Sequence, residues 1–309
     1  RDKALGRTVA LKVLKSLGSF PQEAIERFKR EASAAAALEH PNIIRVHDVG
    51  TLEDGSPFYA MDLLVGQDLA LATHLHSIPL RDAVEAVRQV ALAAHHAHER
   101  GVLHRDIKPQ NMFLRQEGAG FVDPSGAGNV RPTVRAVLLD FGLAKLMGDR
   151  PLFGEGAGGR SVHSLTQSGE FLGTPAFMPP EQVRDSSAVD RRADVYALGA
   201  SLFHALAGKP PFETASVAEL LEAIHGRDAG PPSRWNSEVD ADLDTVCIRC
   251  LQKDPGDRYA SAAALAEDLR RWLEGEPVAA RPIGALGRLW RRARRNRTVA
   301  IPLGVATIV

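Results

Sequence analysis

Hydrophobic and polar positions follow two patterns along this chain of 309 residues. Near the start, β-rich apolar runs predict strands over residues 8–14, 42–49 and 57–64. Between the first two, an alanine-rich helical pattern spans residues 22–38, and the His40-Pro41 pair should end it. We therefore expect a small, strand-rich part at the N-terminal end.

The remainder of the chain is predominantly helical in pattern. Residues 81–100 place Val87 and Val90 on one apolar face. Further helices are predicted over residues 193–207, 217–225, 243–252 and 261–273. Two stretches rich in Gly and Pro, residues 117–132 and 148–159, predict irregular loops. The second part should thus be larger and mostly helical.

Composition supports a sizeable core but conceals an uneven charge. Hydrophobic residues make up 44% and charged residues 25%, which excludes wholesale disorder. Lys plus Arg and Asp plus Glu both total 38, yet residues 278–309 hold seven arginines and no acid. Residues 1–277 therefore carry 0 − 7 = −7, so an acidic body precedes a basic tail.

Cys247 and Cys250 are too few for a disulfide-framed secreted protein and indicate a reducing compartment. Their CIRC spacing raises the hypothesis of a metal or redox site. However, both fall on a helical pattern with Leu243 and Val246, and no further Cys or His stands at zinc spacing. We interpret them as core residues.

The strongest chemical signal is HRDIKPQN at residues 104–111, followed by Asp140-Phe141-Gly142. Val9-Ala10-Leu11-Lys12 precedes these motifs, and GTPAFMPPE follows them at residues 173–181. In this order the motifs resemble those of the protein kinases, over about residues 1–274. The resemblance implies an α+β, bilobal protein-kinase fold with a small β-rich N-lobe, here incomplete, and a larger α-helical C-lobe.

The resemblance also implies a division of the chain. Residues 1–64 correspond to a partial N-lobe and residues 65–274 to the C-lobe, with a loop insertion at 117–132. The Gly-rich loop, whose amides cover the phosphates of ATP, is expected ahead of Arg1. Without it the chain should bind ATP weakly. Residues 275–297 would form a Pro/Ala linker and an Arg-rich juxtamembrane segment.

In the protein kinases, catalysis consists of positioning phosphates and compensating their charge. By resemblance, Asp106 accepts the proton of the attacking hydroxyl and Lys108 lies beside the γ-phosphate. Lys12 would hold the α- and β-phosphates of ATP, and Glu31 would orient Lys12. The alternative interpretation makes Lys12 and Glu31 exposed surface charges.

Two further residues of the motifs are expected to bind metal. Asn111 and Asp140 carry oxygen atoms, the ligands that Mg²⁺ prefers, and Mg²⁺ bridges the phosphates of ATP. The resemblance thus implies ATP and Mg²⁺ as cofactors.

The resemblance places adenosine against six residues: Ala10, Met61, Asp62, Leu64, Asp68 and Phe113. Met61 would be the gatekeeper, the segment from Asp62 to Leu64 the hinge, and Ala10 and Phe113 the walls around adenine. Asp68 would face the ribose, although a solvated surface position is an equally open alternative.

Substrate class and activation follow from the same resemblance. Lys108 and Thr174 match kinases that act on Ser and Thr. Arg105 matches those whose activation segment is ordered by phosphorylation, through pairing of Arg with phosphate. Thr166 and Ser168 are the expected acceptors; the alternative is that both are ordinary loop hydroxyls.

Three other residues are expected to have structural roles. Glu181 and Arg258 match a buried ion pair of the family, and Asp194 matches the residue that braces the catalytic loop. The histidines within residues 95–98 include an HxxH spacing, but no carboxylate completes a known metal site. We interpret them as solvated or core-edge side chains.

The C-terminal end predicts a membrane contact. Six arginines within residues 288–297 precede an uncharged, mostly apolar run at 299–309. Eleven helical residues cover only about 16 Å, about half of a ~30 Å hydrocarbon core. We expect residues 298–309 to begin a truncated transmembrane helix, with the arginines at anionic lipids on the cytoplasmic side. A short buried helix or a frayed terminus is the alternative.

Together these features predict a serine/threonine protein kinase, single-pass in the cell membrane, with its kinase domain in the cytoplasm. Its partners would be protein substrates, a second copy for autophosphorylation and anionic lipids. Nucleic acid is not expected, because Trp290 alone among base-stacking aromatics accompanies the arginines. The alternatives are a pseudokinase that binds without catalysis and, third, a small-molecule phosphotransferase, which the segment at 173–181 disfavours.

Overall fold

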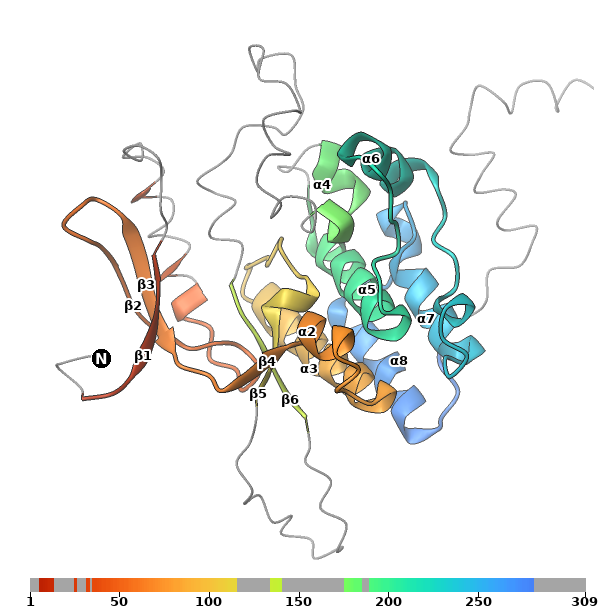
Figure 1. The fold of residues 1–309 in the computed structure, drawn as a ribbon, viewed down its shortest axis with the longest axis horizontal. Helices are drawn as coiled ribbons and strands as arrows, with labels where there is room; N and C mark the ends of the chain where they lie inside the picture. The colour runs from red at the N-terminus through yellow and green to blue at the C-terminus, as the bar shows by residue number, and fades with distance from the viewer. Residues whose placement is uncertain are drawn as a thin grey trace, which may run out of the picture. The chain divides into compact units, whose positions relative to one another are not determined.

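The computed structural model describes residues 6–13, 25–26, 32–33, 35–115, 134–140, 175–184 and 189–280. The chain divides into two compact units, Arg1–Val278 and Ala279–Val309. All helices and strands described below, which Figure 1 shows, belong to the first unit.

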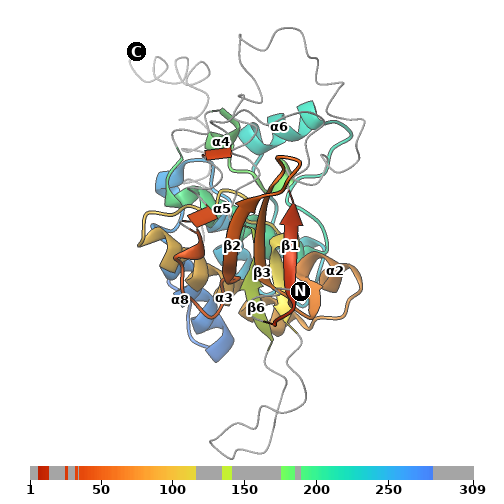
Figure 2. The same ribbon diagram turned by 90° about the vertical axis from the view of Figure 1, so that its left-hand side faces the viewer.

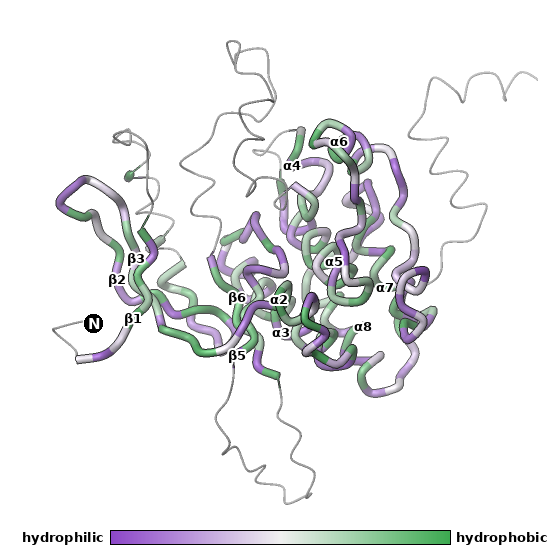
Figure 3. Tube along the Cα trace, in the orientation of Figure 1, coloured by the Kyte–Doolittle hydropathy of each residue, from purple (hydrophilic) through white to green (hydrophobic). Residues whose placement is uncertain are grey.

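A three-stranded antiparallel sheet opens the chain. It consists of β1 (Val9–Val13), β2 (Val46–Thr51) and β3 (Pro57–Asp62), with β3 in the centre (Figure 2). The turn between β2 and β3 is hydrophilic, whereas β3 contains the buried apolar positions of the sheet (Figure 3). In this register Lys12 lies opposite Tyr59. Three strands are therefore present in this region as predicted, and the bounds of β1 and β3 lie within two residues of the prediction.

The strand predicted over residues 42–49 was wrong at its first residues. The N–H of Leu138 donates to the carbonyl of Asn42 at 2.8 Å, and Ile44 donates to the carbonyl of Leu138 at 3.0 Å. Residues 42–44 thus bond to a different part of the fold, and β2 begins only at Val46. Such long-range backbone pairing leaves no mark in the local hydrophobic pattern.

A second small antiparallel sheet contains the residues that follow the motif at 104–111. Its strands are β4 (Gly66–Asp68), β5 (Met112–Arg115) and β6 (Arg135–Leu138), in the order β4-β5-β6. Asp68 and Phe113 are register partners across β4 and β5.

The helical part contains these described helices: α2 (Leu69–His74), α3 (Leu80–His98), α4 (Pro180–Arg184), α5 (Arg191–Ala207), α6 (Val217–Gly226), α7 (Ala241–Cys250) and α8 (Ala262–Glu274). Single 3₁₀ turns lie at Pro109–Asn111, Pro175–Phe177, Pro232–Arg234 and Pro255–Asp257. The helices predicted from the pattern start and end within two residues of α3, α5, α6, α7 and α8. The α+β architecture with a small sheet followed by a helical part is confirmed.

Helix α5 is the centre of the helical core. Most of its residues are buried, and α3, α7 and α8 all pack against it. Asp190 caps its N-terminus by accepting a hydrogen bond from the N–H of Arg192. Gly208, with φ of +74°, ends it in the left-handed conformation that favours glycine.

The close approach of α5 and α7 explains the two cysteines. A Cβ atom at Gly199 of α5 would lie 2.1 Å from the Cβ atom of Cys250, so only glycine fits there. The Sγ atom of Cys247 lies 3.5 Å from the carbonyl oxygen of Gly199. Both thiols are buried, and burial raises the pKa of each. The interpretation of the CIRC pair as core residues is therefore confirmed.

Among the described residues, no helix is long and apolar enough to cross a membrane. The predicted transmembrane segment, residues 298–309, and the Arg-rich segment before it lie outside the described residues.

Candidate active site

The loop at residues 104–111 joins α3 to β5, and the carboxylate of Asp194 binds its backbone. Asp194, in the first turn of α5, is 1% exposed. It accepts hydrogen bonds from the backbone N–H of His104 at 2.9 Å and of Arg105 at 2.8 Å. The predicted bracing role of Asp194 is thus confirmed by its contacts.

His98 supplies a third contact to this carboxylate. Its Nε2 lies 2.7 Å from Asp194 Oδ2, and its side chain is buried at the end of α3. Burial alone would raise the pKa of Asp194, but bonding to His98 and to the loop amides outweighs burial and lowers it. As a whole residue, His98 is intermediate in burial, which agrees with the core-edge interpretation. Its partner was missed, because the sequence pattern could not reveal a carboxylate 96 residues away.

The imidazole of His104 connects the loop to the end of β6. Its Nδ1 accepts from the N–H of Asp106 at 3.2 Å, and its Nε2 lies 2.8 Å from the carbonyl of Leu139. A ring that accepts at Nδ1 and donates at Nε2 is neutral, and burial lowers the pKa of His104 accordingly. His104 therefore keeps Asp106 and the neighbouring Asp140 in fixed relation.

Asp106 lies beside a cation and an amide. Lys108 Nζ is 3.0 Å from Asp106 Oδ2. Asn111 Nδ2 donates to the backbone oxygen of Asp106 at 2.8 Å and approaches its carboxylate at 3.3 Å. Because the amide nitrogen of Asn111 is engaged, its oxygen is the atom left to ligate a cation. The structure thus brings Asp106, Lys108 and Asn111 together, as the motif predicts.

Asp140 follows β6 in a left-handed backbone conformation, with φ of +53°. One carboxylate oxygen forms an ion pair with Lys12 of β1. The other accepts a hydrogen bond from the hydroxyl of Tyr59, on β3. Burial and the charge of Asp140 raise the pKa of Tyr59, so its hydroxyl remains a donor. Tyr59 was missed by sequence reasoning; the one available signal was a phenol in a buried strand, which needs an acceptor.

The residues expected to contact adenosine lie on strands of both sheets, except Leu64, which lies between β3 and β4. Ala10 and Met61 are register partners across β1 and β3. Asp62, at the end of β3, lies 2.7 Å from His47 Nε2. Asp68 caps α2 by accepting from the N–H of Leu71 at 2.8 Å, a role that the sequence analysis did not assign.

Four expected site residues lie outside the described residues: Glu31, Thr166, Ser168 and Thr174. Arg105, the expected partner of a phosphate, has a left-handed backbone with φ of +63°, and its carbonyl accepts from Gln182 Nε2 at 3.0 Å.

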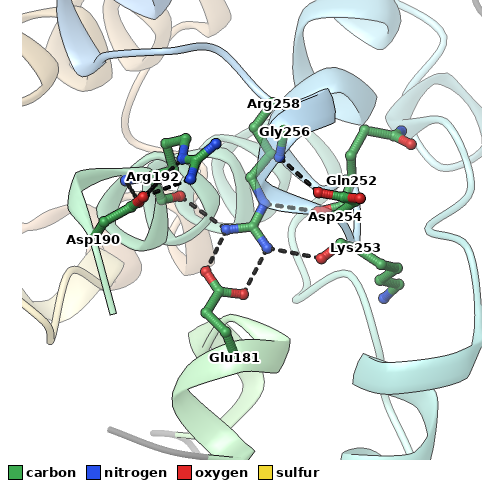
Figure 4. Close-up of polar contacts among 8 residues, drawn as sticks. All are labelled: Glu181, Asp190, Arg192, Gln252, Lys253, Asp254, Gly256 and Arg258. Carbon is green, nitrogen blue, oxygen red and sulfur yellow. Dashed lines mark hydrogen bonds and ion pairs between the residues drawn. The ribbon is translucent and has the colours of Figure 1, made fainter. Parts of the chain in front are cut away.

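The predicted pair of Glu181 and Arg258 is present and bidentate. The guanidinium donates to both carboxylate oxygens of Glu181, at 2.6 and 2.7 Å (Figure 4). It also donates to the backbone carbonyls of Gln252, Arg192 and Lys253. This buried pair ties α4, beside the loop that carries Asp106, to α5 and to the segment before α8.

A family model described as "Protein kinase domain" matches residues 1–269. The serine/threonine-protein kinase PknB of Mycobacterium leprae is 34% identical over 281 residues, which cover 90% of this chain and 40% of that protein. The serine/threonine-protein kinase pkn3 of Myxococcus xanthus is 35% identical over 284 residues, 87% of this chain and 46% of that protein. The chain thus spans less than half the length of these relatives.

Two solved structures are similar. The kinase domain of Mycobacterium tuberculosis PknI superposes with a TM-score of 0.61 at 29% identity, covering 88% of each chain. Rad53, solved in complex with AMP-PNP, has a TM-score of 0.61 at 22% identity, covering 84% of this chain and 57% of Rad53, which supports the fold alone.

Replacing Asp194 by Asn tests the bracing role. An amide has one acceptor oxygen in place of the carboxylate pair, so a buried donor in the loop or on His98 loses its partner. We expect the free energy of unfolding to fall by about 1–3 kcal/mol. Asp190→Asn, in the exposed cap of the same helix, is the matched control and should cost less than about 1 kcal/mol, because Asn caps as well as Asp. Equal losses in urea titrations of the two variants would contradict the assignment.

Proposed function

Because the chain belongs to the protein kinase family, we propose that it transfers the γ-phosphoryl group of ATP to serine and threonine hydroxyls of proteins. The observation that carries this proposal is a set of contacts among four residues: Lys12 pairs with Asp140, Asn111 bonds to Asp106, and the carbonyl of Asn111 accepts from Leu139, the residue before Asp140. Phosphoryl transfer depends on positioning, so these groups must be held in fixed positions. The hydrogen bonds of His104 and Asp194 hold the loop and the residue before Asp140 in place.

Asp106 is the proposed acceptor of the substrate hydroxyl proton. Its carboxylate is mostly buried, and Lys108 beside it offsets its charge while remaining able to approach a phosphate. The amide of Asn111 fixes the backbone and carboxylate of Asp106 from one side. The carboxylate therefore keeps one orientation as a hydroxyl approaches.

The residues present fit a divalent cation, which we propose to be Mg²⁺. Asn111 has its amide oxygen available and Asp140 offers a carboxylate, and Mg²⁺ is commonly held by one or two such ligands together with substrate phosphates. Bound there, the cation would neutralise charge on the phosphates. Lys12 would add a further positive charge, and Ala10, Met61, Asp62, Leu64, Asp68 and Phe113 would receive the adenosine.

A pseudokinase is the alternative from another class. Such a protein would keep the fold and the buried Glu181–Arg258 pair while lacking one of the polar groups that act on phosphate or hydroxyl. All of these groups are present here, and those within the described residues lie next to each other. This adjacency favours the enzyme.

Two isosteric variants of the full-length protein test the roles separately. Asp106→Asn should lower the rate of peptide phosphorylation by about 10²–10⁴-fold with little change in ATP affinity, because only the proton acceptor is lost. Asp140→Asn should weaken metal-dependent ATP binding as well as turnover. Asp242→Asn, an exposed residue of α7, is the control for the chemical change. Near-normal phosphorylation by both site variants would rule out the proposed function.

We further propose that phosphorylation of Thr166 or Ser168 activates the enzyme by pairing the phosphate with Arg105, in trans between two copies. A phosphate brings about −1.5 to −2 charge and forms strong bonds to Arg. After incubation with ATP, mass spectrometry should find phosphate within residues 161–174. Thr166→Ala combined with Ser168→Ala should reduce activity to the level of phosphatase-treated wild type. Undiminished activity of this double variant would remove the switch.

We also propose that the arginines of residues 288–297 contact anionic lipid beside a membrane helix that begins at 298–309. The support is the sequence alone: an Arg cluster directly before an uncharged apolar run. Full-length protein should sediment with the membrane fraction and resist extraction by high salt. Recovery wholly in the supernatant would contradict this proposal.

A further inference from the structure

Tyr59 lies in the middle of β3, the central strand of the first sheet, and is 2% exposed. Its ring packs with Ala32 and with Val46, Val49 and Met61 in a small apolar cluster. Lys12 is its register partner, and the Lys12 Nζ lies 5.9 Å from the centre of its ring. Apolar packing alone would be served equally well by Phe, so the hydroxyl requires a separate explanation.

That hydroxyl donates to Asp140, 81 residues further along the chain. The bond joins Tyr59 to Asp140 Oδ1, whereas Lys12 contacts Asp140 Oδ2. Each carboxylate oxygen is therefore engaged by a different strand of the same sheet. A carboxylate fixed at both oxygens cannot rotate about its last bond.

These contacts leave coordinating capacity on Asp140. A carboxylate has about four acceptor positions on its two oxygens, and Tyr59 and Lys12 occupy one on each. The remaining positions have fixed directions because the oxygens are fixed. Asp140 itself follows β6 in the left-handed region, so its backbone does not provide the rigidity of a regular strand.

We propose that Tyr59 is a positioning residue for the divalent cation: its hydroxyl holds the carboxylate of Asp140 in the orientation that binds the metal. The proposal rests on the proposed function, in which Asp140 is a metal ligand. In the proposed function Lys12 contacts phosphate, and it would then no longer hold Oδ2 of Asp140. Tyr59 has no role toward phosphate, so among the described residues it would continue to hold Oδ1.

Tyr59→Phe in the full-length protein is the test. It keeps the ring in its apolar cluster and removes the hydroxyl that donates to Asp140. The measurements are Mn²⁺ binding by electron paramagnetic resonance, and Mg²⁺ titration of the binding of a non-hydrolysable ATP analogue. We expect the half-saturating metal concentration to rise by about 3- to 30-fold. This corresponds to part of the free energy of a hydrogen bond to a charged acceptor. Analogue binding in EDTA and the thermal midpoint in EDTA should change little.

Tyr259→Phe is the matched control. Tyr259 is also a buried phenol whose hydroxyl donates to a carboxylate, that of Asp268 at 2.7 Å, but it lies beside α8. Its loss should leave the metal titration unchanged. Tyr59→Met provides a second variant without the hydroxyl, should the Phe variant be poorly folded.

The outcomes separate this proposal from the proposed function. Metal dependence that is equal in wild type and Tyr59→Phe, or tighter in the variant, overturns the positioning role and leaves the kinase assignment intact. A tighter variant would show that Tyr59 competes with the metal. Wild-type protein whose analogue binding does not depend on metal would overturn the proposed function and this inference together.

Discussion

The carboxylate of Asp194 accepts hydrogen bonds from two consecutive backbone amides of the loop that carries Asp106, and it also contacts His98. Burying a charge costs free energy unless hydrogen bonds satisfy it. The buried Asp194 carboxylate therefore requires these hydrogen bonds in the folded state. Its helix, α5, is packed on nearly all sides by other helices. The loop is therefore held rigidly by its bonds to the core, although its only regular structure is one 3₁₀ turn.

From this point a continuous set of contacts extends to the first sheet. His104 accepts from Asp106 and reaches the carbonyl of Leu139, the residue before Asp140. Asp140 in turn contacts Lys12 and Tyr59, which lie opposite each other on β1 and β3. Asp106, Asp140 and Lys12 are thus connected through side chains rather than through regular secondary structure. Such an arrangement would preorganise the site for charge compensation in the roles proposed for these residues.

The residues that belong to ordered motifs could be predicted from the sequence. The catalytic loop, Asp140, the Glu181–Arg258 pair and the helices α3 and α5 all follow from motif order or from helical periodicity. Tyr59 and His98 were missed because their partners, Asp140 and Asp194, lie 81 and 96 residues away and only the folded chain brings them near. The same cause displaced the start of β2, since Leu138 takes the hydrogen bonds of residues 42–44.

Amide hydrogen exchange at single-residue resolution tests the central role of Asp194 most directly. The amides of His104 and Arg105 lie outside helices and strands, where exchange normally requires little opening. If Asp194 binds them within the core, both should exchange as slowly as the amides in the middle of α5, such as those of Leu198 and Leu202. Exchange as fast as that of the exposed turn at residues 53–55 would show that the loop at residues 104–111 does not depend on this carboxylate.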